Sequence, residues 1–303
     1  MNQIKGTLIL LITSIIWGST FVAQSVGMDS IGPFAFNIAR YITGLICLTP
    51  VVLFIIKRLK RKRKDYKKYV KFSYKAGILS GIFAGLAGNF QQHGMLVASA
   101  SKAGFLTALY IVFVPIIAYI VFKKKTNSNT VVAVTLAIIG FYLLSVKGDF
   151  AIEISDLELI ACAFCYSIQI VIIDKYAKDT EPIIFTQAQL IPSLFISIAA
   201  FIIFKEKFDI VNLQNAIIPI LYAGIMSLSV ASCLQVIGQK YSDPTVATIV
   251  MSLESVFAAI FGYLFQNDIL STREIIGCIT IFLAVILSQI DPNKLIQIKN
   301  RHR

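Results

Sequence analysis

The chain has 303 residues, of which 57% are hydrophobic and only 15% are charged. A soluble domain carries about 25% charged residues, so this composition excludes an ordinary soluble enzyme or binding domain. The formal net charge of +12 is concentrated in short segments between apolar runs, which argues for a membrane protein and against a nucleic-acid-binding protein.

Ten apolar stretches follow one another along the chain, most of them without Asp, Glu, Lys or Arg. A stretch of about 20 such residues is long enough to cross the hydrocarbon core of a bilayer. Their residues do not alternate between apolar and polar as barrel strands do, so we interpret them as helices. The sequence therefore predicts an all-α integral membrane protein with ten transmembrane helices, at approximately residues 6–27, 34–56, 76–93, 103–122, 129–146, 158–174, 182–204, 213–237, 246–266 and 274–290.

The first stretch has some features of a secretory signal peptide. However, Lys5 is the only basic residue before it, no convincing A-x-A cleavage site is present, and nine similar stretches follow. We therefore interpret it as a retained first span.

The connection between the second and third stretches, Lys57–Lys75, holds 11 of the 28 Lys and Arg residues. A polybasic loop beside a membrane span is expected to contact anionic lipid headgroups. If the N-terminus is cytoplasmic, the cytoplasmic segments carry 22 basic residues and the opposite side carries five, with Arg40 inside a span. The positive-inside rule thus places both termini in the cytoplasm, and we expect a multi-pass protein of a bacterial plasma membrane.

The two halves of the chain resemble each other weakly. An offset of 149 residues aligns Trp17 with Tyr166, and an offset of 144 further along aligns Gln91 with Gln235. Ten spans divide into five and five, and because five is odd the second half enters the membrane from the opposite side. Inverted repeats of this kind recur in secondary transporters, with the substrate site near the midplane. The predicted units are residues 1–147 and 148–303.

Four segments in this order carry a family resemblance: WGSTFVAQ at Trp17–Gln24, IARYITG at Ile38–Gly44, SKAGFLTALYIVFVPIIAY at Ser101–Tyr119 and LESVFAAIFGYLF at Leu253–Phe265. They resemble the drug/metabolite transporter superfamily, in its EamA branch of ten-helix carriers, over nearly the whole chain. The resemblance implies ten helices, cytoplasmic termini, and export or import of small metabolites. Family members handle amino acids, nucleosides, sugars and drugs. This chain departs from the family at Ser255, where a Pro is typical.

Arg40 and Glu254 are the two ionisable residues deep inside the predicted spans. At 1.5 Å per residue Glu254 is about 13 Å deep, where a charge is costly. It is either a proton-coupling or substrate-binding group, or one partner of a buried helix–helix hydrogen bond. Arg40 is about 10 Å from the outer end of its span, within reach of the interface for its long side chain. It is either an interface anchor, a counter-charge for a substrate carboxylate, or a partner for Glu254.

Neutral polar residues also share helical faces, as Asn89 does with Gln92 and Tyr166 does with Gln169, at i and i+3. They either form hydrogen bonds across helices or line a solute cavity of aromatic and amide character. With Glu254 assigned to proton coupling, the predicted substrate-binding residues are Trp17, Arg40, Asn89, Gln92, Tyr110, Tyr166, Gln169, Gln189 and Gln235.

Cys162 and Cys165 form a CxxC on one helical face, without a second CxxC or clustered His. We interpret them as small residues at helix contacts and predict neither a metal site nor a cofactor.

The most direct functional interpretation is a secondary transporter of small metabolites that works by alternating access. Its expected substrates are amino acids or related organic solutes, with export as the direction and protons as coupling ions. An integral-membrane enzyme would need a motif such as HExxH, and the sequence has none. A membrane signalling or assembly protein would need an appended soluble domain, for which the loops and tails are too short. The sequence leaves a homodimer open.

Overall fold

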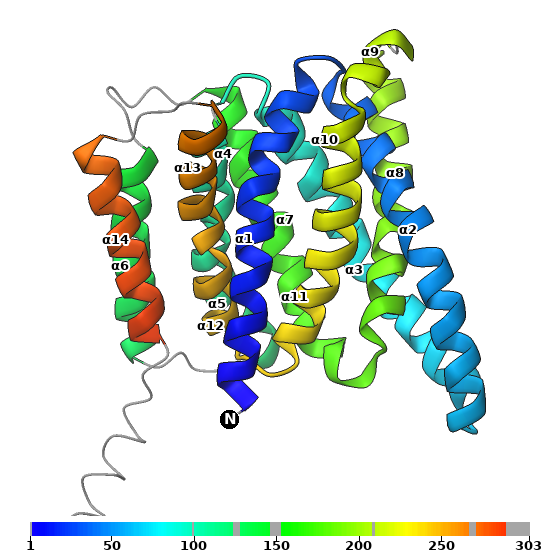
Figure 1. The fold of residues 1–303 in the computed structure, drawn as a ribbon. Helices are drawn as coiled ribbons and strands as arrows, with labels where there is room; N and C mark the ends of the chain where they lie inside the picture. The colour runs from blue at the N-terminus through cyan, green and yellow to red at the C-terminus, as the bar shows by residue number, and fades with distance from the viewer. Residues whose placement is uncertain are drawn as a thin grey trace, which may run out of the picture.

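A computed structural model describes residues 2–98, 100–123, 128–145, 153–207, 210–266 and 271–288, and these ranges form helices with no β-strand. The predicted all-α class is thus confirmed (Figure 1). In chain order the elements are α1 (Asn2–Met28), α2 (Pro33–Lys62), α3 (Tyr66–Gly94), α4 (Ala100–Ala108), α5 (Tyr110–Phe122), α6 (Ser128–Ser145), α7 (Ile154–Tyr176), η1 (Ala177–Asp179), α8 (Pro182–Ile203), α9 (Ile210–Asn215), α10 (Ile217–Tyr222), η2 (Ala223–Ala231), α11 (Ser232–Gln239), α12 (Pro244–Met251), α13 (Leu253–Gln266) and α14 (Thr272–Ser288).

Seven helical segments among the described residues are long and apolar enough to cross a membrane, judged by length and composition. Three of these are interrupted rather than continuous helices, because α4–α5, α10–η2–α11 and α12–α13 each form one segment. A shorter apolar helix covers Ser128–Leu143. The total of ten spans stays a prediction.

The basic connection Lys57–Lys75 differs from the expected loop. Helix α2 continues to Lys62 and α3 begins at Tyr66, so only three residues join them. Lys and Arg are good helix formers, and basic side chains in the last turn of α2 favour the negative end of its dipole. The basic residues therefore extend two helices instead of interrupting them, at the same end of the bundle as the N-terminus (Figure 1).

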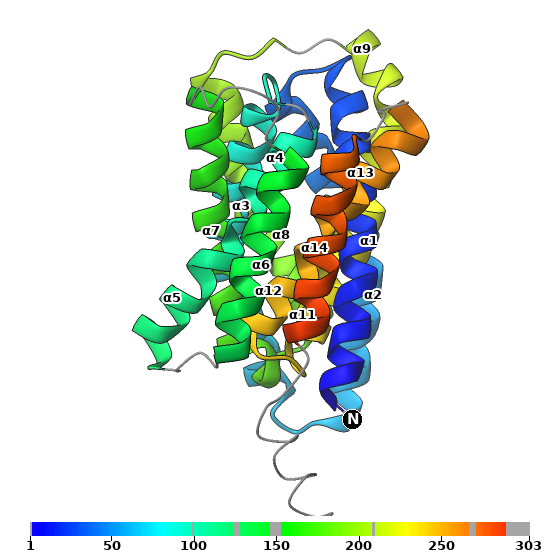
Figure 2. The ribbon, with the colours of Figure 1, turned by 90° about the vertical axis from the view of Figure 1, so that its left-hand side faces the viewer.

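The helices of the two halves interleave. Helix α3 packs extensively on α7 and α8, α1 packs on α13, and α2 packs on α8. Helices α6 and α14 form a separate pair at one side of the bundle (Figures 1 and 2). The largest core cluster joins that pair to α5 and α12, through side chains that include Ile111, Phe141, Ile249, Met251 and Ile281.

The start of α2 is held by a residue of the loop that follows α8. The Glu206 carboxylate accepts hydrogen bonds from the backbone N–H groups of Phe34 (3.0 Å) and Ala35 (2.8 Å). A carboxylate at a helix N-terminus satisfies unpaired N–H groups and favours the positive end of the dipole. Close by, the His93 ring stacks on Phe34, and its Nδ1 lies 2.9 Å from the Glu158 carboxylate of α7. These contacts close the end of the bundle opposite the N-terminus.

Candidate functional site

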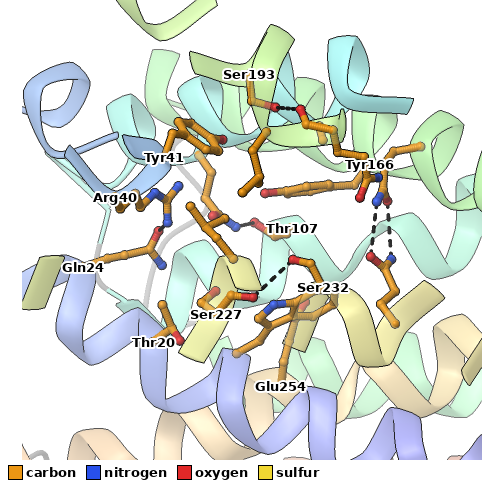
Figure 3. A pocket seen from close by; sticks show the side chains of 18 of the residues that line it. Thr20, Gln24, Arg40, Tyr41, Thr107, Tyr166, Ser193, Ser227, Ser232 and Glu254 are labelled. Carbon is orange, nitrogen blue, oxygen red and sulfur yellow. Dashed lines mark hydrogen bonds between the residues drawn. The ribbon is translucent and has the colours of Figure 1, made fainter. Parts of the chain in front are cut away.

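A cavity lies inside the bundle, and helices from both halves of the chain contribute to its wall (Figure 3). Its volume is about 90 Å³. A single water needs roughly 10–15 Å³ on the same measure, so there is room for several waters or a small solute. The lining residues are Trp17, Thr20, Phe21, Gln24, Arg40, Tyr41, Ala84, Gln91, Thr107, Tyr110, Tyr166, Gln169, Ile170, Gln189, Leu190, Ser193, Ser227, Leu228, Ser232, Gln235 and Glu254.

Arg40 lines this cavity from the second turn of α2 and is only 4% exposed. Its Nη1 donates a hydrogen bond to Gln24 Oε1 of α1 at 2.5 Å. The guanidinium carbon lies 5.9 Å from the centre of the Phe36 ring and 5.6 Å from that of Tyr41. The interface-anchor interpretation is therefore wrong: depth would have let the side chain reach the surface, but this face of α2 turns inward.

Glu254 lines the same cavity and is also 4% exposed. It belongs to the first turn of α13. Tyr110, the first residue of α5, donates its hydroxyl to Glu254 Oε1 at 2.9 Å. Arg40 and Glu254 form no ion pair with each other. Figure 3 shows Arg40 beside Gln24 on one side of the cavity and Glu254 on another.

Tyr110 and Glu254 are 144 residues apart, which is the offset at which the sequence predicts that this part of the two halves aligns. Tyr110 directly follows a break in its span at Leu109, and Glu254 lies two residues after a break at Ser252 in the other half. At both breaks the hydrogen bonds tighten to i−3, from Val112 N–H to the Leu109 carbonyl and from Ser255 N–H to the Ser252 carbonyl. Discontinuous helices of this kind mark binding sites in many transporters.

A third interruption lies in the segment that follows α10. Nine residues, Ala223–Ala231, form the π-helix η2. The hydroxyls of Ser229 and Ser232 donate to the Gly224 and Ser227 carbonyls five residues earlier. Ser227 and Ser232 both line the cavity, so the wide turn places serine side chains at its wall.

Amides supply much of the remaining polar wall. Gln169 of α7 donates its Nε2 to Gln235 Oε1 of α11 at 3.2 Å, and Gln189 of α8 donates its Nε2 to Ser80 Oγ of α3 at 2.8 Å. The cavity thus gathers eight of the ten residues predicted from the sequence, namely Trp17, Arg40, Tyr110, Tyr166, Gln169, Gln189, Gln235 and Glu254.

Asn89 and Gln92 do not line this cavity. Asn89 donates its Nδ2 to the Gly85 carbonyl and to Ser197 Oγ, and its Oδ1 accepts a hydrogen bond from Asn37. It thus takes the helix–helix bonding role that was the alternative interpretation for the neutral polar residues. Gln92 is fully buried, and its amide has no hydrogen-bond partner among the described residues.

Sequence reasoning missed several lining residues, among them Gln24, Tyr41, Thr107 and Ser193. Two of these residues lie in sequence segments that could have identified them. Gln24 ends the WGSTFVAQ segment, and Tyr41 follows Arg40 within IARYITG. Small hydroxyl side chains within apolar helices give no such signal, because they are as common at helix contacts as at binding sites.

Comparison with known proteins gives a consistent picture over almost the whole chain. The sequence model of the EamA-like transporter family matches residues 4–146 and again residues 154–289. An uncharacterized transporter of Archaeoglobus fulgidus is 32% identical over 288 residues, covering 95% of this chain and 86% of that protein. The uncharacterized transporter YoaV of Bacillus subtilis is 20% identical, covering 94% of this chain and 97% of its own length.

A solved crystal structure of a protein with 17% sequence identity is also similar. Its TM-score is 0.74, with 94% of this chain and 96% of that chain covered. At this identity the likeness concerns the fold alone.

Proposed function

Because this chain belongs to the EamA-like transporter family, it is a multi-pass membrane transporter rather than an enzyme, and we propose that it carries amino acids or related organic solutes by alternating access. One observation carries the proposal. The cavity, to which both family-matched halves contribute, is lined by a buried arginine and a buried glutamate, Arg40 and Glu254, that do not pair with each other. Ionisable residues within membrane helices are costly and mark transport pathways.

The proposed architecture has ten crossings in two inverted units, residues 1–147 and 148–303, with both termini in the cytoplasm. The interrupted segments α4–α5, α10–η2–α11 and α12–α13 each count as one crossing, α1, α2, α7 and α8 add four, and α3, α6 and α14 complete the ten. The equivalent positions of Tyr110 and Glu254, hydrogen-bonded to each other, support this arrangement. Residues related by a two-fold axis can touch only if they lie close to that axis.

We assign proton coupling to Glu254. When Glu254 is ionised it accepts from Tyr110 and can also accept from a donor group of the solute. When it is protonated it loses much of that capacity, so proton and solute compete for the site. Such competition lets an inward proton gradient drive solute outward, and export is therefore the proposed direction in a bacterial plasma membrane. The basic extensions of α2 and α3 would contact anionic lipid on the cytoplasmic side.

The test is flux in proteoliposomes that contain the purified chain. Each of the 20 proteinogenic amino acids is loaded inside, and efflux is followed with and without an imposed proton gradient. Solute-specific efflux that the gradient accelerates is the expected result. Vesicles that contain Glu254→Gln separate coupling from transport, because any exchange of unlabelled for labelled solute that remains, even with a raised KM, should not respond to the proton gradient. No flux of any amino acid in either direction would overturn the proposal.

A further inference from the structure

We propose that the transported solute carries a carboxylate that binds the free edge of the Arg40 guanidinium, and that Gln24 is the positioning residue that orients this edge. The inference rests on the proposed transport function and names the chemical group by which the site selects its solute. The observation behind it is that the buried Arg40 side chain has an N–H donor without an acceptor.

Arg40 has fewer partners than a buried arginine needs. The guanidinium has five N–H donors and stays protonated at any physiological pH. Its Nη1 donates to the amide oxygen of Gln24, and a further side-chain hydrogen bond links it to the Tyr41 hydroxyl, so both of these acceptors are neutral. Its Nε is buried and has no hydrogen-bond partner among the described residues. A buried charge in this condition is unfavourable until an anion joins it.

No carboxylate of the described chain supplies that anion. The ion pairs there join Arg63 to Asp65, His93 to Glu158, and Lys102 to Glu153 and Asp156. Glu254 is the acidic residue of the cavity wall, and it accepts from Tyr110 instead. The charged partner of Arg40 must therefore enter from the cavity.

The geometry of the free edge favours a carboxylate over other anions. The Nε–H group and one N–H group of Nη2 point the same way and form one edge of the guanidinium. Nη1, which donates to Gln24, lies on the other side. The two parallel N–H groups of such an edge match the two oxygens of a carboxylate. The Phe36 and Tyr41 rings lie within 6 Å of the guanidinium carbon and restrict its other motions.

Gln24 has the properties of a positioning residue. It is 3% exposed, comes from α1, and accepts from the Nη1 that faces away from the free edge. A neutral amide fixes the guanidinium without cancelling its charge. A carboxylate at the same place would orient it equally well but would compete with the solute.

The consequence for the solute is a defined orientation. Its carboxylate lies toward α1 and α2, and the rest of the molecule extends toward Glu254 and Tyr110 on another part of the wall (Figure 3). An amino group on the solute then faces the Glu254 carboxylate. Amino acids satisfy both ends, whereas amines and amides satisfy only one.

The experiment compares matched solutes on the full chain in detergent and in proteoliposomes. The probes are the 20 proteinogenic amino acids, their carboxamides and their decarboxylated amines. Thermal stabilisation and counterflow are measured for each. Stabilisation and flux by amino acids, with carboxamides and amines at least about tenfold weaker, are the expected results for loss of a charge-assisted hydrogen-bond pair.

Three variants locate the effect. Arg40→Gln should remove the preference for the acid over its carboxamide, and without solute it should be at least as stable as the parent chain. Gln24→Glu should raise KM for amino acids about tenfold or more through competition, whereas Gln24→Ala should raise KM with little change in kcat. Arg58→Gln, in the exposed basic extension of α2, is the matched control and should leave both measurements unchanged.

Two results would overturn the inference while sparing the proposed function: equal transport of acids and carboxamides by the parent chain, or an unchanged acid preference in Arg40→Gln. Absence of flux and of stabilisation for every probe would instead overturn the proposed function together with the inference.

Discussion

Two interrupted segments, α4–α5 and α12–α13, are paired by the predicted repeat, yet they differ in burial. The apolar window of Pro244–Phe265 is 83% buried inside the molecule, against 39% for Lys102–Phe122. Figure 2 shows α5 at the edge of the bundle, with α12 nearer its middle. The ionisable residue, Glu254, belongs to the central segment, and the more peripheral segment contributes the neutral Tyr110.

We interpret this difference as a division of roles between the two predicted repeats. A carboxylate that must be shielded from lipid is tolerated on the segment that other helices surround. The equivalent position on the exposed segment carries a group that can donate a hydrogen bond but has no charge at neutral pH. The following predictions test this division, from the largest expected effect to the smallest.

Replacing Glu254 by Gln should abolish the pH dependence of transport, because the glutamine side chain does not titrate. The measurement is the initial rate of efflux from proteoliposomes across pH 5–9. The matched control is Glu181→Gln, at the Glu181 carboxylate just before α8 and outside the spans. A pH profile in the Glu254 variant that equals the parent profile would exclude Glu254 as the coupling group.

Replacing Gly18 by Ala should destabilise the protein by about 3 kcal/mol, near the upper end for overpacking. A Cβ on Gly18 would overlap Phe257 Cβ and lie 2.7 Å from the Glu254 carbonyl oxygen, so α1 and α13 must separate. Gly104→Ala is the matched control on α4, because its Cβ would meet nothing closer than Ser255 Oγ at 3.5 Å. Thermal unfolding in detergent should separate the two variants, and equal melting temperatures would contradict the close α1–α13 packing.

Replacing Tyr110 by Phe should cost about 2 kcal/mol, because it leaves the buried Glu254 oxygen without its donor. It should also shift the pH profile of transport toward higher pH, since an ionised carboxylate that loses a donor holds its proton more tightly. Tyr166→Phe removes a hydroxyl from the same cavity without touching that bond and should leave the profile in place. An identical profile for both variants would show that the bond does not affect Glu254.

The smallest effect is expected at Glu181, at the end of the bundle that carries the N-terminus. Burial raises the pKa of this carboxyl above its ordinary value near 4.5, while Lys240 and Arg58 act in the opposite direction. The folded protein therefore holds this proton to higher pH than the unfolded chain does. The linked stability is greatest below the ordinary pKa and is lost as pH rises through the raised pKa. Glu181→Gln should flatten this fall in melting temperature, and an unaltered slope would contradict it.

The sequence predicted well how deep a residue lies along its helix. It predicted poorly which way that residue points around the helix axis. Charge-free runs predicted the helical class and singled out Arg40 and Glu254. Whether Arg40 pointed toward lipid or inward depended on how α2 is rotated against α1 and α8, which one helix alone does not specify. Asn89 and Gln92 share a face as predicted, but that face meets α2 and α8 rather than the cavity.

The breaks were also beyond the reach of local sequence. Neither Leu109 nor Ser252 is a Gly or Pro, and the prolines of this region, Pro115 and Pro244, lie elsewhere. Packing against neighbouring helices must therefore favour the tighter turns there. By contrast, the helical extensions of α2 and α3 could have been anticipated from the propensities of Lys and Arg, had these residues not been assigned to a loop.

Hydrogen bonds join α8 to α2 and α3 at several points along their length. Glu206 ties the loop after α8 to the start of α2, and Gln187 donates to Thr49 Oγ1 near the other end. Ser193 donates to the Gly81 carbonyl between α8 and α3. These bonds join α2 and α3 of the first half to α8 of the second half, and we expect the three helices to move together as one rigid unit. The cavity lies where this unit faces α1 and α13, so we expect relative movement at that boundary to change access to the cavity.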